Sequence, residues 1–204
     1  MSAISYYAGY AWSDHPECVD SVIRALCIKL NDGLPSDAER ERIIGPHILA
    51  PVGTAQGTEM TIARAFVCAD TAVRVCAPRA LDAAGMPAEA QKLRDLPEIS
   101  SAETARDAAN AAYAADTVHA ANAAYAADTV HAANAAYYAA DTAQVAVARV
   151  AASAAAAHYI AAAHEAAADA HEAAEDILAL ILRLCAMGSR VEVPQVRDLS
   201  ELPQ

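Results

Sequence analysis

The sequence of 204 residues has few of the large apolar side chains that usually fill a protein core. Aromatic residues make up 5% of the chain, with one Phe and one Trp. Leu, Ile, Val and Phe together number 39, or 19%, just below the level of roughly 20% at which a highly charged chain is expected to be disordered. The chain holds 57 alanines instead. Because alanine is the strongest helix former, this composition predicts helices around a thin core.

Other absences exclude whole classes of protein. The net charge of −12 argues against a general nucleic-acid binder, which needs clustered Lys and Arg. No run of 18 apolar residues is present, so no membrane-spanning helix is expected. No basic segment precedes Arg24, so we expect no secretory signal peptide. The five cysteines lack Cys-x-x-Cys spacing, which predicts reduced, buried thiols in a cytoplasmic protein.

Glycine and proline divide the chain near residue 100. Neither occurs between Glu98 and Met187, and half of residues 101–176 are alanine. The expected fold class is all-α, with a bundle of short helices followed by long Ala-rich helices that form a rod or a helical hairpin. The predicted division is a helical N-terminal domain over 1–99, an Ala-rich helical repeat arm over 100–188 and an extended tail over 189–204.

Caps and spacing place the first short helices. Asp14 or His15 can cap a helix that begins at Pro16, where a missing N–H costs nothing. Its apolar face has helical spacing, with Val19, Val22, Ile23, Leu26 and Leu30. Gly33 is expected to end this helix in a left-handed conformation. Ser36 and Glu39 form a capping box for the next helix.

A third helix is expected to start at Thr58 and to end before Pro78. Its predicted inward side chains are Met60, Ala63, Phe66, Val67 and Val73. Two short pieces follow, over 79–84 and 87–96, which Gly85 and Pro97 end. The segment from Gly53 to Gly57 lacks the Lys-Ser/Thr of a phosphate-binding loop and is predicted to be a turn.

Several short motifs occur in a characteristic order. They are His15-Pro16-Glu17-Cys18-Val19, Asn31-Asp32-Gly33-Leu34-Pro35-Ser36-Asp37, Val52-Gly53-Thr54, Asp70-Thr71-Ala72-Val73-Arg74-Val75 and Pro78-Arg79-Ala80-Leu81. This run resembles an uncharacterised family of bacterial proteins that have such an N-terminal helical region followed by a variable Ala-rich repeat. The resemblance covers roughly residues 14–105 and implies a bacterial source, but no activity and no functional residue.

Residues 108–143 contain a tandem repeat of 12 residues, AANAAYAADTVH in its first two copies. A helix advances about 100° per residue, so 12 residues rotate a position by about 120°. Equivalent tyrosines therefore point in three directions around a continuous helix, which a dimeric coiled coil does not allow. Two geometries remain open: long helices with alanine on all sides, or short helices that begin at each Asp-Thr pair.

The long-helix geometry predicts that the arm associates with copies of itself, because alanine allows close approach and the chain has too few large apolar residues to bury the arm. The expected self-association residues are Ala112, Tyr113, Ala124, Tyr125, Ala136 and Tyr137. Residues 177–184 form the densest apolar cluster, which can pack on the N-terminal bundle or on a second copy.

No enzyme signature stands out, and no cofactor is expected. His164, His171 and Glu175 are weak candidates for a metal site, since His171 and Glu175 lie at i and i+4, but the Glu-x-x-His pattern of helical-bundle metal sites is missing. The aromatic N-terminus is expected to cover an edge of the core or to bind a partner. The first hypothesis is a non-enzymatic structural or interaction protein that forms a homo-oligomer or filament. The alternative is a compact helical binding, immunity or regulatory protein for a small ligand, metal or effector protein.

Overall fold

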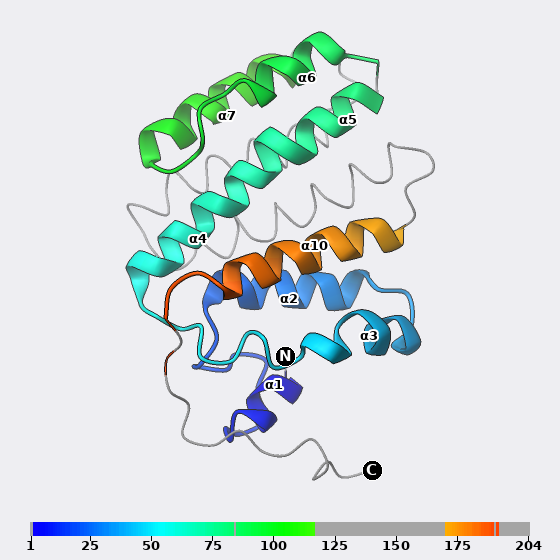
Figure 1. Cartoon of the computed structure of the whole chain (residues 1–204), viewed down its shortest axis with the longest axis vertical. Coiled ribbons are helices and arrows are strands. Elements are labelled where there is room, and N and C mark those ends of the chain that lie inside the picture. Colours follow the sequence, from blue (N-terminus) through cyan, green and yellow to red (C-terminus); the bar gives the residue numbers. More distant parts are fainter. Residues whose placement is uncertain (1, 84, 117–169, 190, 192–204) are drawn as a thin grey trace.

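The computed structural model describes residues 2–83, 85–116, 170–189 and 191. Within these residues every regular element is a helix (Figure 1), so the all-α fold class is confirmed for this part of the chain. Residues 117–169 and 192–204 lie outside the described residues. The predicted rod or hairpin and the predicted extended tail therefore stay predictions.

The first half of the chain consists of helices, with the longest connections before α2 and before α4. The helices are α1 (Ser2–Tyr7), α2 (Ser21–Gly33), α3 (Asp37–Ile43), a 3₁₀ turn (Gly45–His47), α4 (Thr58–Thr71), the π-helix η2 (Ala72–Cys76), α5 (Ala77–Ala83) and α6 (Pro87–Arg94). The last two described helices are α7 (Ala102–Asp116), which includes the start of the repeat, and α10 (Ala170–Cys185), which follows it.

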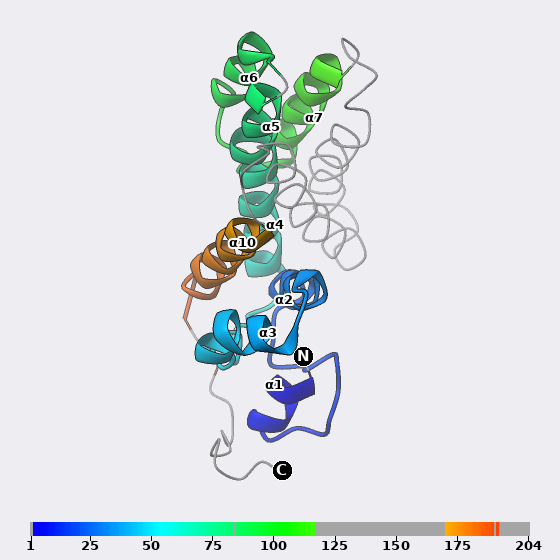
Figure 2. The same cartoon turned by 90° about the vertical axis from the view of Figure 1, so that its right-hand side faces the viewer.

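The continuous column of α4, η2 and α5 organises the described helices (Figure 1). α6 packs against α5, and α7 packs against α6. Figure 2 shows α2, α3 and α10 grouped at the other end of the column, where α10 contacts α2, α3 and α4. The described helices thus form one connected stack, and their buried apolar side chains belong to one core.

Helix α2 begins five residues later than the sequence predicts. Its N-cap is Asp20, whose Oδ1 accepts a hydrogen bond of 2.9 Å from the backbone N–H of Val22. Asp14 and His15 are exposed and precede the helix, so the predicted start at Pro16 is wrong. The predicted apolar face is nevertheless buried, with Val19, Val22, Ile23, Leu26 and Leu30 at most 4% exposed.

The end of α2 depends on a proline rather than on a left-handed glycine. Gly33 is the last helical residue and has no positive φ. Leu34 then adopts an extended conformation with ψ 132°, because Pro35 disfavours a helical residue before it. The predicted left-handed stop is therefore wrong. Of the predicted capping box the structure shows the Ser36 half, in which the Ser36 hydroxyl accepts a hydrogen bond from the Glu39 N–H.

The column continues through Pro78, where the sequence predicts that a helix ends. Proline has no N–H, so the carbonyl of Arg74 loses its usual partner four residues later. The chain widens into the π-helix η2 just before this point, and the N–H of Ala77 bonds the carbonyl of Ala72. A π-turn of this kind lets a helix pass an interruption of its hydrogen-bond ladder. The prediction that the helix ends before Pro78 is wrong.

The inward face of α4 also differs from the prediction. Met60, Ala63, Phe66 and Val67 are half-buried, and of the predicted set Val73 is fully buried. The fully buried side chains are instead small, apart from one arginine: Arg64, Ala65, Cys68, Ala69, Ala72 and Cys76. Small side chains let neighbouring backbones approach closely, which is how a chain with few large apolar residues fills its core.

Helix α10 supplies the large apolar side chains that pack against α2. Ile177, Leu180, Ile181 and Leu184 are at most 5% exposed and belong to the same core as the N-terminal helices. Of the two packing partners that the sequence allows for this cluster, the structure thus shows the N-terminal bundle. The end of α10 meets the start of α2, so the two helices run antiparallel.

Candidate functional site

The centre of this helical junction is a buried arginine. Arg64 points from α4 into the core, and its side chain is completely buried. Charged side chains are almost never fully buried unless they are paired, because the loss of hydration is costly. The polar groups that surround Arg64 are therefore the first candidates for a functional site.

The Arg64 guanidinium is surrounded by oxygen atoms from three parts of the chain. It forms an ion pair of 3.0 Å with Asp20 Oδ2, and it donates hydrogen bonds to the Thr54 carbonyl (2.6 Å), Gln56 Oε1 (3.3 Å), the Leu184 carbonyl (3.1 Å) and the Met187 carbonyl (3.0 Å). These five contacts match the donor capacity of a guanidinium, which has five N–H groups. We call this set of residues the Arg64 cluster.

Asp20 contributes to the cluster through both carboxylate oxygens. Oδ1 caps α2, while Oδ2 faces Arg64 and also accepts a hydrogen bond of 2.6 Å from the Thr61 hydroxyl. The backbone N–H of Asp20 donates to Thr54 Oγ1 over 3.1 Å. This one residue therefore fixes the start of α2 to both α4 and the loop that precedes α4.

Of the turn that the sequence predicts from Gly53 to Gly57, the structure shows only its first residue as part of a turn; residues 54–57 form an irregular loop, and both glycines have positive φ. Two of its polar side chains, Thr54 and Gln56, form hydrogen bonds that hold the cluster in place. Buried Thr54 bonds the Pro51 carbonyl over 2.6 Å, and Gln56 bonds both Arg64 and the carbonyl of Ser189.

The C-terminal end of α10 is held by the same cluster. The last carbonyls of a helix lack partners within the helix and carry partial negative charge, so a cation there is favourable. Arg64 supplies it through the carbonyls of Leu184 and Met187. Gly188 follows with φ 75°, and a side chain at this position would collide with Gln56 and Met60. The arrangement explains why a glycine follows the end of α10.

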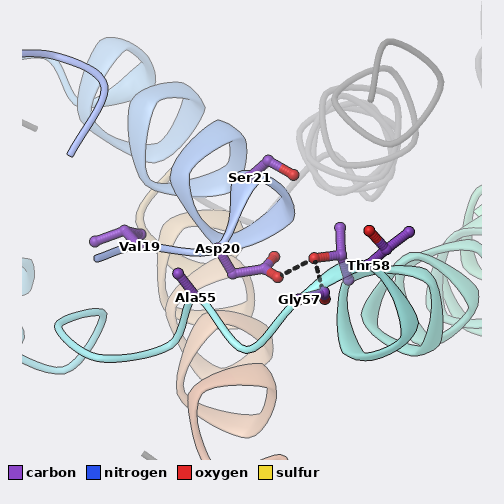
Figure 3. Close-up of a pocket in the computed structure, with 7 residues that line it drawn as sticks. Val19, Asp20, Ser21, Ala55, Gly57 and Thr58 are labelled. Atoms are coloured by element: carbon purple, nitrogen blue, oxygen red, sulfur yellow. Dashed lines mark hydrogen bonds between the residues drawn. The ribbon is translucent and has the colours of Figure 1, made fainter. Parts of the chain in front are cut away.

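A shallow pocket of about 200 Å³ adjoins the cluster (Figure 3). It lies between the first residues of α2 and α4 and is lined by Val19, Asp20, Ser21, Ala55, Gly57, Thr58 and Thr61. Ligand pockets usually measure about 300–1,000 Å³, so this one suits a molecule of few atoms. The Asp20 carboxylate in this pocket is already paired with Arg64 and Thr61. The hydroxyls of Ser21 and Thr58 are therefore the side-chain groups that could bind a ligand.

The predicted metal and self-association residues are only partly within the described residues. His164, Ala124, Tyr125, Ala136 and Tyr137 lie outside them. Ala112 and Tyr113 belong to α7, and His171 belongs to α10. Among the described residues no group of three or more His, Cys, Asp or Glu is placed to hold a metal ion.

Glu175, the remaining metal candidate, is exposed on α10 and lies 3.9 Å from the guanidinium of Arg42 on α3. The adjacent Asp176 pairs with Arg79 of α5 at 2.8 Å. In the described part of the chain these two carboxylates thus face arginines of the N-terminal helices rather than a common ligand.

All five cysteines are free thiols, and four of them are buried as the sequence predicts, whereas Cys27 is half-buried against the core. Burial and then the neighbouring Cys185 raise the pKa of Cys27 to about 12. Burial and then Asp20 raise the pKa of Cys68, and burial raises that of Cys18 despite a backbone hydrogen bond from Gly53. Reactive cysteines have lowered pKa values, so these thiols are poor nucleophiles.

Sequence reasoning did not find the Arg64 cluster. Arg64 interrupts an otherwise apolar stretch, from Ile62 to Val67, and this was the signal available. Its oxygen partners come from residues up to 123 positions away, and three of them are backbone carbonyls, which carry no sequence signature.

Comparison with protein-family models, with curated proteins and with solved structures finds no match to this chain. No helix among the described residues is long and apolar enough to cross a membrane.

Proposed function

We propose that this chain is a non-enzymatic interaction protein whose helical core presents the Ala-rich repeat for association with further copies of the chain. One observation carries the proposal. The helices that flank the repeat, α7 and α10, both contribute to the same core, through Ala105 and Ala108 on one side and Ile177 to Leu184 on the other. The described residues on both sides of 117–169 therefore belong to the same core.

The repeat supplies the reason for self-association. Its first copy starts at Ala108 and belongs to α7 as far as Asp116, so the repeat begins as a helix. The 12-residue period turns equivalent positions by about 120° along a helix, which offers similar Ala-rich surfaces to neighbours in several directions. A helix that is apolar on all sides is stable when other helices cover it.

The test is the mass of the full chain by size-exclusion chromatography with light scattering at several concentrations. We expect masses above the 21.2 kDa monomer that grow with concentration. The triple variant Ala112→Glu, Ala124→Glu and Ala136→Glu should shift the chain toward the monomer, because it places charge on the predicted contact surface.

A matched control adds the same three negative charges at positions outside the repeat. Ala38, Ala88 and Ala179 are exposed helical alanines of the described residues, and their replacement by Glu should leave the assembly intact. Equal masses for wild type and the repeat variant would contradict the proposal, as would a monomer at every concentration.

The alternative is a compact binding, immunity or regulatory protein, which the pocket beside Ser21 and Thr58 supports. A ligand that binds the folded state raises its unfolding temperature. For the metal version, thermal unfolding with Zn²⁺, Ni²⁺, Mn²⁺ or Fe²⁺ should show a rise that the double variant His171→Ala and Glu175→Ala abolishes. No rise with these cations would exclude this version.

A further inference from the structure

The aromatic residues of the N-terminal segment divide between the core and the surface. Tyr7 is buried, whereas Trp12 is 66% exposed, the largest exposure among the exposed large hydrophobic side chains of the described residues. The ring of Trp12 lies 6.0 Å from that of half-buried Tyr6, at an angle of 60°. We call Tyr6 and Trp12 the aromatic patch. Part of this segment thus covers an edge of the core, and the patch remains as an exposed surface.

The backbone beside the patch is fixed by hydrogen bonds. Ser5 on α1 is buried, and its hydroxyl donates a bond of 2.6 Å to the carbonyl of Ser13, the residue after Trp12. Farther along, the carbonyl of Cys18 accepts a bond of 3.2 Å from the N–H of Ala55. A surface that is already ordered loses less conformational entropy when a partner binds. The segment that carries Trp12 is therefore suited to binding.

The exposed charges that follow the patch are negative. Asp14 and Glu17 are both exposed, and no lysine or arginine occurs in residues 1–23. Consecutive Cα atoms are 3.8 Å apart, so the Cα atoms of Trp12 and Asp14 are separated by at most about 8 Å. A negative surface attracts cations and repels the phosphate groups of nucleic acids and of anionic lipids. The charges beside the patch are thus complementary to a cationic partner.

An arginine side chain matches both features of this surface. Its planar guanidinium stacks on aromatic rings, and tryptophan is the aromatic residue that attracts cations most strongly. Its fork of N–H groups also binds a carboxylate through two parallel hydrogen bonds. A lysine ammonium is a compact, strongly hydrated point charge and lacks this planar fork. An exposed tryptophan with a carboxylate two residues away therefore favours arginine over lysine.

We propose that the aromatic patch binds an arginine-containing segment of a partner protein, with a guanidinium stacked on Trp12 and paired with Asp14. Glu17 adds to the negative potential that attracts this segment. The inference is independent of the proposed function of the repeat, because it depends only on residues of the N-terminal segment.

Trp12 is the single tryptophan of the chain, so its fluorescence reports binding at the patch. The probe is a peptide of alternating arginine and glycine, added to the full chain at pH 8 and low ionic strength. The emission of Trp12 should change along a saturable curve. The same peptide with citrulline in place of arginine keeps the shape but lacks the charge, and it should leave the emission unchanged. A peptide of alternating lysine and glycine should bind more weakly than the arginine peptide.

Variants of the chain test the two contacts separately. Asp14→Asn should raise the dissociation constant of the arginine peptide about 2–5-fold, the range expected for an exposed ion pair. Trp12→Leu should raise it about 2–5-fold as well, the range expected for an exposed cation–π contact, and isothermal titration calorimetry measures this variant. Far-UV circular dichroism verifies that both variants keep their helices.

The matched control is Asp107→Asn, which removes one exposed carboxylate from α7, at the opposite end of the described stack from α1 (Figures 1 and 2). It should leave the dissociation constant as in wild type. Equal affinities of wild type and Asp14→Asn would overturn the proposal, as would equal binding of the citrulline or lysine peptide. An equal loss in Asp107→Asn would also overturn it, because the peptide would then respond to net charge alone.

A second copy of the chain is the other possible occupant of the patch. Acrylamide quenching of Trp12 without any peptide distinguishes it. The quenching constant should be independent of protein concentration, as expected for an exposed ring that waits for a different partner. A quenching constant that falls as protein concentration rises would overturn the proposal in favour of contacts between copies.

Discussion

The Nε of Arg64 donates a hydrogen bond of 3.1 Å to the carbonyl of Leu184, a residue 120 positions later in the chain. This bond joins the column of the N-terminal half to the end of the last described helix. Because the same guanidinium faces the N-cap of α2 through Asp20, one side chain connects three helices. The following predictions test this connection and the core around it.

Replacement of Arg64 by Met should lower the free energy of unfolding by about 3–5 kcal/mol, since it leaves the Asp20 carboxylate buried without its partner. Urea unfolding measures the loss. The control is Arg94→Met, which removes an ion pair with Asp82 that is more than a third exposed on both sides. Exposed pairs contribute about 0–1 kcal/mol, so a similar loss for both variants would contradict the role given to Arg64.

Asp20 and Arg64 should be energetically coupled. Asp20→Asn keeps an oxygen that can cap α2 but removes the charge, whereas Asp20→Ala removes both and should cost about 1 kcal/mol more. In a double-mutant cycle with Arg64→Met, the two losses should add to more than the loss of the double variant, by about 0.5–3 kcal/mol. Strict additivity in urea unfolding would show that the 3.0 Å contact contributes nothing.

Stability should fall at alkaline pH because of the buried thiols. Below pH 9, which is the ordinary pKa of a cysteine thiol, the thiols are protonated in both the folded and the unfolded chain. Above it the unfolded chain loses these protons, while Cys27 in the folded chain keeps its proton up to about pH 12. Each such thiol therefore removes about 1.4 kcal/mol of stability per pH unit in this interval.

The measurement is urea unfolding at pH 7.5, 9 and 10 on the wild type and on the double variant Cys27→Ala and Cys68→Ala. The variant should have a smaller slope of stability against pH. An unchanged slope would mean that other groups, such as tyrosines and lysines, cause the whole decline.

The docking of α10 can be tested at its centre. Ile181→Ala should cost about 2–5 kcal/mol, the usual range for a buried aliphatic side chain, and the loss should not depend on protein concentration because the contact is within one chain. Ala179→Ser, on the exposed side of the same helix, should change stability by less than about 0.5 kcal/mol. A loss at Ile181 that disappears at high concentration would indicate packing between copies.

Helix propensity and apolar spacing predicted the fold class and the buried face of α2, since both depend on local sequence. The Ser36 N-cap of α3 was predictable for the same reason. The start of α2 was not, because the choice between Asp14, His15 and Asp20 as the cap depends on Arg64, which lies 44 positions beyond Asp20. The continuation of the helix through Pro78 was missed because the π-helix before it compensates for the missing N–H.

The candidate site was even less accessible from sequence. The spacing rule assigned apolar side chains to the inner face of α4, and tertiary contacts placed Arg64 there instead. Such a burial requires carbonyls of Thr54, Leu184 and Met187 to converge on one point, and no pattern within α4 records this. Arginine within an apolar run is therefore a signal to consider, but its partners come only from the fold.

The antiparallel docking of α10 on α2 has a consequence for the length of the repeat. The described contacts at the two ends involve the repeat only through its first copy, at Ala108 and Ala111, so later copies can be gained or lost without a change in those contacts. The free energy that those contacts contribute to folding therefore does not depend on the number of later copies. The number of repeats is thus nearly neutral for folding, and the length of the repeat segment can change without any change in the core.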